Sequence, residues 1–407
     1  MAEQHEKALV PQIRFTGFTD PWEQRKLGEL FEESDERASD REILSVSVAN
    51  GIYPASESDR ETNPGASLAN YKVVHSGDVV YNSMRMWQGA VDASRYDGIV
   101  SPAYVVAKPN SEVYARFFAR LLRQPMLLKQ YQQVSQGNSK DTQVLKFDDF
   151  ASIEISMPAS ENEQRRIGAF FDRLDSLITL HQRKYDKLCV LKKSMLDKMF
   201  PKGGSLYPEI RFAGFTNHWE QRKLEDYVVV STAKNVDGRF NKEDVLSVSG
   251  EYGIVNQIAF QGRSFAGSSV LNYGIVNTGD IVYTKSPLNS NPYGIIKVNK
   301  GIPGIVSTLY AVYRPQDNVH TNFIQVYFEQ HERMNNYMHP LVNKGAKNDM
   351  KVTAENALKG VVTFPSREEQ VIISEFFDRL DSLITLHQRK LELLRNIKKS
   401  MLDKMFV

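Results

Sequence analysis

The sequence FFDRLDSLITLHQRK stands at Phe170–Lys184 and recurs letter for letter at Phe376–Lys390. Apolar side chains extend from each copy at heptad positions a, d and e, which predicts one long helix, roughly 40 residues and about 60 Å in length, with a single buried stripe. Such a helix needs a partner in water, and the other copy has the same length and pattern, so we expect an antiparallel coiled coil. The a and d positions are Ile167, Leu174, His181, Leu188, Met195, Phe170, Leu177, Lys184, Leu191 and Lys198 in the first helix, and Ile373, Leu380, His387, Leu394, Met401, Phe376, Leu383 and Ile397 in the second.

The rest of the chain is also written twice, in the same order. Between the two helices the copies have drifted apart, and loops of different length separate the matched stretches, as expected of a tandem duplication rather than a solenoid. The matched pairs are Ile13–Thr19 with Ile210–Thr216, Trp22–Leu27 with Trp219–Leu224, Leu44–Ser47 with Leu246–Ser249, Gly77–Tyr81 with Gly279–Tyr283, Gly98–Ser101 with Gly304–Ser307, and Lys192–Phe200 with Lys398–Phe406.

Each copy begins with a region of mixed texture, which we call a head. Short Val/Ile/Tyr-rich runs broken by Gly, Pro and Asn predict strands and turns, and Val113–Val134, interrupted by Pro125, predicts a helical piece among them. The fold class expected is therefore α+β: two similar mixed α/β domains joined by two long helices in pseudo-twofold symmetry. The predicted boundaries are 1–159 for the first head, 160–200 for the first helix, 201–208 for a linker, 209–365 for the second head and 366–407 for the second helix.

Composition limits the classes of protein that remain. The 407 residues are 41% hydrophobic, enough for ordinary cores, and the single cysteine, Cys189, excludes an internal disulfide framework and a multi-cysteine zinc site. We find no signal core and no apolar run long enough to span a membrane, so the expected location is the cytoplasm. A net charge of +2 leaves nucleic-acid binding open, because a basic groove can be balanced by acidic surface elsewhere.

Two similar but differently surfaced heads on paired helices suit the reading of two short elements on one linear polymer. DNA fits, because half-sites read from the same face lie about one helical turn apart, and unlike heads would read an asymmetric, split sequence. The bland alternative is an architectural coiled-coil adaptor whose two heads bind proteins.

The ordered motifs resemble those of the DNA-specificity subunits of type I restriction–modification enzymes. They are IRFxGFxxxWEQRKL at the start of each head, GDVVY or GDIVY, GIVS, and a proline followed by Glu-Gln at each helix entry (Pro158 with Glu163-Gln164, and Pro365 with Glu369-Gln370). The resemblance covers nearly the whole chain. It implies two target recognition domains and two spacer helices, on which two modification (adenine-methylating) subunits dock. It also implies that restriction/translocase subunits join for host defence, and that S-adenosylmethionine, ATP and Mg are bound by those partners, with no cofactor in this chain.

Candidate DNA contacts are sought where the heads diverge between matched strands, because base reading needs polar and basic side chains on projecting loops. Arg85 and Lys285, directly after a matched strand, rank highest, while Lys140 and Lys344 suit phosphate contacts. Trp87 suits stacking on a base or, as the commoner alternative, packing at the root of its loop. The DNA-contact candidates are Ser83, Arg85, Trp87, Gln88, Asn138 and Lys140 in the first head, and Lys285, Asn289, Asn291, Lys344, Lys347 and Asn348 in the second.

The identity of the two helices extends beyond the apolar stripe, which fixes only a, d and e. Two copies of one partner need two matching surfaces, so we interpret the repeated solvent-facing residues as docking positions; recent duplication or recombination is the competing cause. The docking candidates are Arg173, Asp175 and Gln182, with Arg379, Asp381 and Gln388 in the second helix. His181 and His387, at position a, are interpreted as register-setting residues and not as ligands.

Motifs for catalysis are missing from the sequence. Ser290-Asn291-Pro292-Tyr293 is one proline short of the loop that holds a flipped adenine in a methyltransferase, and no glycine-rich turn precedes it. There is no G-x-x-x-x-G-K-[ST] for ATP and no cluster with metal-ligand spacing. A self-sufficient methyltransferase is thus the least favoured hypothesis, and we expect a non-catalytic recognition subunit.

Overall fold

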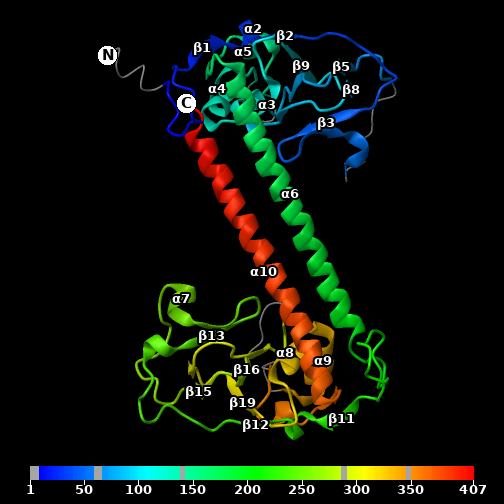
Figure 1. Cartoon of the computed structure of the whole chain (residues 1–407), viewed down its shortest axis with the longest axis vertical. Helices are drawn as coiled ribbons and strands as arrows, with labels where there is room; N and C mark the ends of the chain where they lie inside the picture. The colour runs from blue at the N-terminus through cyan, green and yellow to red at the C-terminus, as the bar shows by residue number, and fades with distance from the viewer. Residues whose placement is uncertain (1–8, 59–66, 138–142, 286–290, 345–349) are drawn as a thin grey trace. The chain divides into compact units, whose positions relative to one another are not determined.

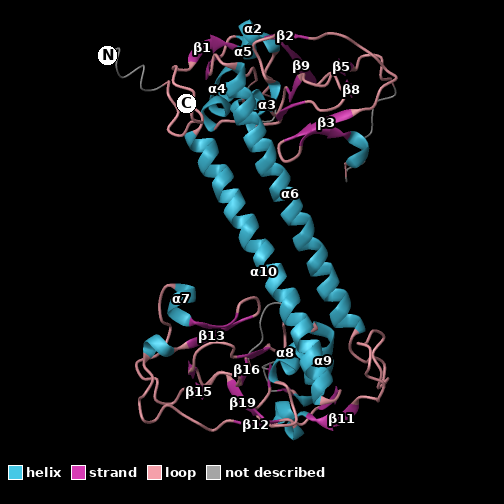
Figure 2. Cartoon of the chain, viewed as in Figure 1, coloured by secondary structure: helices cyan, strands magenta, loops and turns pink. Residues whose placement is uncertain are grey.

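The computed structural model describes residues 9–58, 67–137, 143–285, 291–344 and 350–407 (Figure 1). The chain forms two compact units: unit 1 comprises Met1–Gln182 with Arg389–Val407, and unit 2 comprises Arg183–Gln388. Each unit therefore contains one head, the beginning of the helix that follows it, and the end of the other long helix. The mixture of helix and strand predicted for both heads is confirmed (Figure 2).

Unit 1 is built on a four-stranded antiparallel sheet in the order β2-β9-β6-β7, to which three strand pairs, β1-β10, β3-β4 and β5-β8, are added. The elements are β1 (Glu23–Lys26), α2 (Leu27–Leu30), β2 (Phe31–Glu33), β3 (Leu44–Ser47), β4 (Gly51–Pro54), η1 (Ala55–Glu57), β5 (Lys72–Val74), β6 (Val79–Asn82), η2 (Met86–Gln88), β7 (Val91–Ala93), β8 (Gly98–Val100), β9 (Tyr104–Pro109), α3 (Ala115–Leu121), α4 (Pro125–Val134), α5 (Phe147–Ala151) and β10 (Glu154–Met157).

Unit 2 repeats this plan, with the four-stranded sheet β12-β19-β16-β17 and the pairs β11-β22, β13-β14, β15-β18 and β20-β21. Its elements are β11 (Glu220–Lys223), η3 (Leu224–Asp226), β12 (Val228–Val230), η4 (Lys242–Asp244), β13 (Leu246–Ser249), β14 (Gly253–Asn256), α7 (Gln257–Gln261), β15 (Gly274–Val276), β16 (Ile281–Tyr283), β17 (Ile296–Val298), β18 (Gly304–Val306), β19 (Ala311–Pro315), α8 (Thr321–Glu329), α9 (His331–Met338), η5 (His339–Leu341), β20 (Asn343–Lys344), β21 (Met350–Lys351), η6 (Asn356–Leu358) and β22 (Val361–Phe364).

The matched GD motif forms the turn that precedes an inner strand of each four-stranded sheet, β6 in unit 1 and β16 in unit 2. The Asp78 carboxylate accepts a hydrogen bond from the His75 backbone N–H at 2.8 Å, and Asp280 does the same for Asn277 at 2.8 Å. The glycine before each aspartate has a positive φ, 103° at Gly77, a conformation that side-chain-bearing residues rarely adopt. The motif therefore serves the turn.

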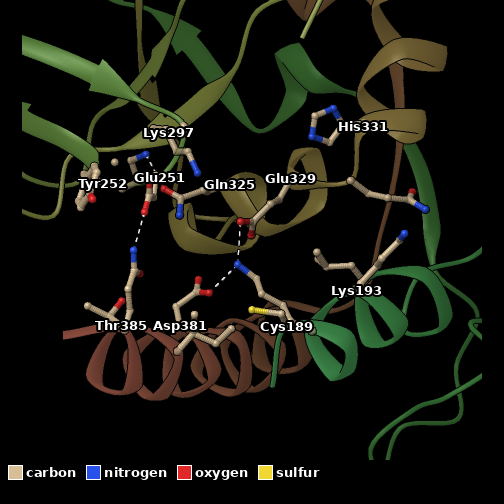
Figure 3. A pocket seen from close by; sticks show the side chains of 18 of the residues that line it. Cys189, Lys193, Glu251, Tyr252, Lys297, Gln325, Glu329, His331, Asp381 and Thr385 are labelled. Atoms are coloured by element: carbon tan, nitrogen blue, oxygen red, sulfur yellow. Dashed lines mark hydrogen bonds and ion pairs between the residues drawn. The ribbon is translucent and has the colours of Figure 1, made fainter. Parts of the chain in front are cut away.

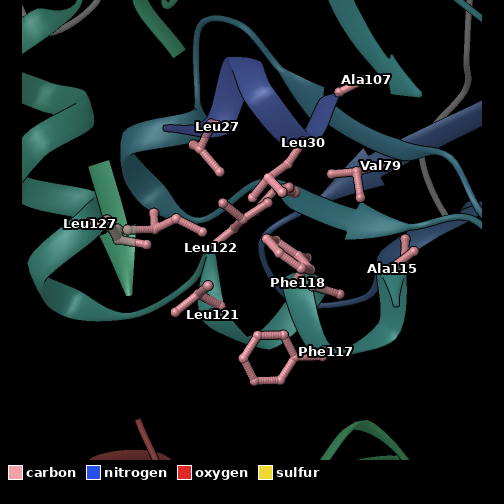
Figure 4. Packing of buried hydrophobic residues seen from close by; sticks show 14 of the residues in the cluster. Leu27, Leu30, Val79, Ala107, Ala115, Phe117, Phe118, Leu121, Leu122 and Leu127 are labelled. Atoms are coloured by element: carbon pink, nitrogen blue, oxygen red, sulfur yellow. The ribbon is translucent and has the colours of Figure 1, made fainter. Parts of the chain in front are cut away.

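The core of unit 1 lies between its sheet and helices α2–α5 (Figure 4). Phe117 and Phe118 of α3 are fully buried there, and the ring of Phe406, from the last residues of the chain, stacks on Phe117 with centroids 5.5 Å apart. In unit 2 Phe200, just beyond the end of the first long helix, packs on Phe323 at 5.8 Å. The repeated KKSMLDKMF segments thus supply core residues to a head.

The long helices are α6 (Glu161–Lys198) and α10 (Arg367–Lys404), as the heptad pattern predicts (Figure 1). Both start from the same anchor. Arg14 donates two hydrogen bonds of 2.7 Å to the buried Glu163 carboxylate in the first turn of α6, and Arg211 makes the same pair of 2.7 Å bonds with Glu369 of α10. The matched IRF and Glu-Gln motifs are therefore two halves of one structural contact.

Antiparallel pairing is visible inside each unit, where the start of one long helix lies against the end of the other. In unit 1 Lys398 of α10 pairs with Asp175 of α6 at 2.5 Å, and in unit 2 Lys192 of α6 pairs with Asp381 of α10 at 2.5 Å. The predicted seam needs a correction, because Leu191 and Leu383, both at position d, are 39% and 44% exposed. The a and e positions of both helices are buried or half-buried, and the exposed positions of the predicted stripe all belong to d. The d residues near the helix starts, Phe170 and Phe376, still pack against a core.

Candidate nucleic-acid interface

The loop after β6 holds the leading candidates of the first head. Met86 is fully buried and anchors the short η2 helix, so its neighbours Arg85 and Gln88 are held on the exposed side. Ser83 is tied back, because its hydroxyl donates to the Ala103 carbonyl at 2.7 Å. Trp87 packs against the core and donates to the Met84 carbonyl at 3.2 Å, so the structure shows the packed aromatic at a loop root and not a free stacking platform.

The second divergent segment of the first head is brought against the first. The Leu145 N–H donates to the Ser83 carbonyl at 2.9 Å, and Gln136 and Val144 form an antiparallel bridge that closes the segment between them. Asn138 and Lys140, which lie in that segment, are outside the described residues. Two loops separated by some fifty positions in the chain thus converge on one place, as a composite DNA-reading surface requires.

A groove of about 690 Å³ lies between this loop and the tip of the β3-β4 hairpin. The polar side chains of Asn82 and Arg85 line one side, and Ser45, Ser47 and Asn50 line the hairpin side. Tyr104, at the start of β9, also lines the groove and supplies an aromatic ring. These donors and acceptors, with one exposed guanidinium, are the groups that read base edges.

The hairpin residues and Tyr104 were missed by the sequence reasoning. The sequence predicts DNA contacts where the heads diverge, whereas Leu44–Ser47 is a matched stretch and Tyr104 has a counterpart in Tyr310. The signal that points to Asn50 is its place in the turn of a predicted hairpin, directly after the matched stretch.

In the second head, Lys285 lies a few residues after the end of β16, much as Arg85 lies a few residues after the end of β6. Its ammonium group donates to the Thr308 carbonyl at 3.0 Å, and burial together with the nearby Lys234 lowers its pKa. The ring of Tyr293 meets that of His339 at 6.3 Å, and His339 precedes β20, where Lys344 lies, by a few residues. Most of the two candidate segments of this head is outside the described residues. Asn291 is the first described residue after Lys285. Asn289, Lys347 and Asn348 are outside the described residues.

The six docking candidates divide into two kinds. Arg173 and Arg379 are exposed on their helices. The other four are half-buried, which corrects the expectation that they face solvent. Residues far away in the sequence reach them, from the head of the same unit or from the other long helix. Asp175 pairs with Arg120 at 2.7 Å and with Lys398, and Gln182 accepts from Arg395 at 3.0 Å. Asp381 pairs with Lys192, and Gln388 donates to Glu251 at 3.0 Å (Figure 3).

Metal and membrane features give negative results. Within the described ranges, no group of three or more His, Cys, Asp or Glu side chains is placed to hold a metal ion. Nor does any helix in the described part of the chain combine the length and apolar character needed to cross a membrane.

A duplicated head with divergent polar loops, followed in each copy by a long helix that contains the same stretch (Phe170–Lys184 and Phe376–Lys390), is the arrangement expected of proteins that read DNA with two recognition domains. The model of the type I restriction modification DNA specificity domain matches residues 19–189 and again 217–396. The chain belongs to this family and carries two copies of its domain. It is thus a DNA-specificity subunit.

Three solved structures are similar to this chain, and the first of them supports the fold. The S subunit of a type I restriction–modification system from M. genitalium aligns with a TM-score of 0.55 at 14% identity, over 98% of this chain and 99% of that one. The HsdS subunit from Thermoanaerobacter tengcongensis aligns with a TM-score of 0.42 at 18% identity, over 97% and 99% of the two chains. A chain from a study of assembly and conformational transition of the type I R-M system gives 0.44 at 16% identity, over 95% and 98%.

Proposed function

We propose that this specificity subunit directs modification without chemistry of its own: each head reads one half of a split, asymmetric DNA site, and the long helices dock two modification subunits that methylate adenine. The observation that carries the proposal is the contrast between the copies. The loops beside Arg85 and Lys285 differ, while Phe170–Lys184 and Phe376–Lys390 of the two long helices are identical, exposed positions included. Two different recognition domains joined to two matching docking surfaces would bring two identical modification subunits to two different half-sites.

In the first head, the groove beside η2 supports direct base reading. Arg85 is exposed at its edge, and a guanidinium can bond in bidentate fashion to the O6 and N7 atoms of guanine. In the second head, Lys285 follows the matched strand at the position that Ser83 has in the first head, and its lowered pKa follows from partial removal of the ammonium group from water. A cation already partly desolvated gives up less hydration when it meets a base or phosphate.

The docking surface is better defined by exposure than by identity alone. Leu180 is 46% exposed and its duplicate Leu386 is 44% exposed, although an isolated helix surface has no use for a repeated apolar residue. Arg173 with Thr179, and Arg379 with Thr385, are exposed on the same helices. An exposed leucine beside an arginine is the composition expected of a protein-binding patch. We therefore place the two modification subunits on these two patches.

The chemistry would belong to the partners. S-adenosylmethionine would be bound by the modification subunits, and ATP with Mg by restriction/translocase subunits that join them. The support is the sequence of this chain, which has no glycine-rich nucleotide loop and only a partial adenine-holding motif at Ser290–Tyr293.

The test is DNA binding by the full chain purified with its modification subunit. We expect tight binding to duplexes that carry the sequence methylated by the complex and weak binding to duplexes of scrambled sequence. The affinity should fall as the salt concentration is raised. Equal affinity for all duplexes would reject sequence reading and leave the coiled-coil adaptor as the better account. Methyl transfer by the isolated chain would reject the non-catalytic role.

A further inference from the structure

A basic hollow of about 570 Å³ lies in unit 1, where the junction of α3 and α4 meets α6 and the end of α10. Five basic side chains line it, against two carboxylates, Asp175 and Asp403. The basic residues are Arg120, Arg123, Arg395, Lys398 and Lys399. A second hollow of about 490 Å³ shares Arg120, Arg123, Lys398 and Asp175, and adds Arg95 and Arg116 together with the carboxylates of Glu57 and Asp92.

The two innermost arginines have donors left over. Arg120 is paired with Asp172 and Asp175 through Nη2, and Arg123 donates from Nε to the Val91 carbonyl at 2.8 Å. Arg120 Nε and Arg123 Nη2 are nevertheless buried without a hydrogen-bond partner among the described residues. Buried donors are rarely left unsatisfied in folded proteins, and each calls for an explanation.

The equivalent hollow of unit 2, of about 1010 Å³, contains a carboxylate that the hollow of unit 1 lacks (Figure 3). There Lys192 and Asp381 repeat the Lys398–Asp175 pair, but Glu329 stands where unit 1 has Arg123, and Cys189 stands where it has Arg395. The Glu329 carboxylate bonds Lys192 at 2.7 Å. Unit 2 thus supplies its own oxyanion to the repeated lysine, whereas unit 1 presents two further guanidinium groups at the same place.

We propose that the basic hollow of unit 1 is a binding site for a phosphate-bearing anion, which occupies the place of the Glu329 carboxylate in unit 2. The excess of basic groups over carboxylates suits a dianion, and guanidinium forks match phosphate oxygens in bidentate geometry. The hollow also has apolar walls, Pro125, Ile178 and Leu402, so the basic groups would bind the phosphate itself and the walls leave room for the carbon skeleton of an ester.

The phosphate has two conceivable sources, a free phosphate compound or the backbone of DNA. The second hollow and the groove beside η2 both reach Asn50 and Tyr53 of the β3-β4 hairpin, so a DNA strand is a real alternative source. The site itself does not depend on the function proposed above, because its charge and its unsatisfied donors stand without DNA.

The experiment titrates the full chain with inorganic phosphate and with pyrophosphate by calorimetry, at constant ionic strength kept with chloride. We expect binding that Arg123→Gln weakens about tenfold, the usual effect of one charge-assisted hydrogen bond. Lys399→Gln, at an exposed position that leaves the core intact, should weaken it about threefold. Lys193→Gln, the same change at the equivalent position of unit 2, is the matched control and should leave affinity unchanged.

Two results would overturn the proposal: no heat beyond the chloride blank, or equal weakening by Lys399→Gln and Lys193→Gln, which would mean unspecific charge attraction. Duplex binding by the same variants then identifies the source. A phosphate site used by DNA requires Lys399→Gln to lower the duplex affinity and its salt slope as well, whereas a site for a free compound leaves both unchanged. If a variant loses phosphate binding but still binds its duplex selectively, only the phosphate site is lost and the proposed function is not affected.

Discussion

The anchor between Arg14 and Glu163 gives a prediction whose size follows from the geometry. The Glu163 carboxylate is 1% exposed and takes both 2.7 Å hydrogen bonds from Arg14, which is 12% exposed. Arg14→Met keeps much of the side-chain volume and removes the charge, so a buried carboxylate loses its counter-ion. Breaking one partner of a buried pair costs about 3–5 kcal/mol, and we expect the lower end, about 3 kcal/mol of the unfolding free energy of unit 1, because Arg14 retains some contact with water.

Hydrogen exchange read by mass spectrometry resolves the effect along the chain. Arg14→Met should lower protection of the first turns of α6, near residues 161–175, and leave residues 367–381 of α10 unchanged; Arg211→Met is the matched variant and should do the reverse. Removing both charges with Arg14→Met and Glu163→Leu should restore most of the stability, since no charge is then left unpaired. The reasoning is refuted if the double variant is as unstable as the single one, or if each single variant affects both helices alike.

Three further predictions concern other parts of the molecule. Gly51 and Gly253 both have positive φ, but a Cβ at Gly51 would lie 1.9 Å from Asp92 Oδ2, while nothing lies within 4 Å of a Cβ at Gly253. In urea denaturation, Gly51→Ala should therefore lower the unfolding free energy by at least about 1 kcal/mol more than Gly253→Ala does. Burial and the nearby Arg367 lower the pKa of His320 from 6.5, so the unfolded chain binds this proton at a higher pH than the folded chain does. The melting temperature should therefore fall more between pH 7.5 and 5.5 in the native chain than in His320→Asn. Equal falls in the two proteins would contradict this prediction. Leu180→Asp or Leu386→Asp should each remove one of two modification subunits from the purified complex, measured by mass in light scattering, and an unchanged mass would place docking elsewhere.

The duplication made much of the architecture predictable. Two copies in one order imply two like heads, and a heptad pattern longer than a typical globular helix implies the long helices, both of which the structure confirms. Periodicity predicts a stripe of a, d and e positions, but it could not show that the d positions Leu191 and Leu383 lie at the exposed edge of that stripe. The pattern gives the width of an apolar stripe, but the partner decides which edge of it is covered.

The functional residues were less predictable because their contacts are distant in the chain. Asp175 was read from its position on the helix alone, whereas Arg120 of the head and Lys398 at the far end of the chain decide its surroundings. The same holds for Glu163, which the sequence presents as part of a motif and the structure as the partner of Arg14. Matched motifs were mostly structural, and the groove shows that matched segments can also line a reading surface.

The central claim is that two unlike heads read two halves of one DNA site, and mapping of methylated adenines across the genome tests it most directly. Cells would express the modification subunit with the native chain, with Arg85→Gln or with Lys285→Gln. We expect a split methylated sequence in which Arg85→Gln relaxes one half only and Lys285→Gln relaxes the other half only, each by about 1–3 kcal/mol of discrimination at one base. Methylation that does not depend on this chain, or a single variant that changes both halves, would contradict the account.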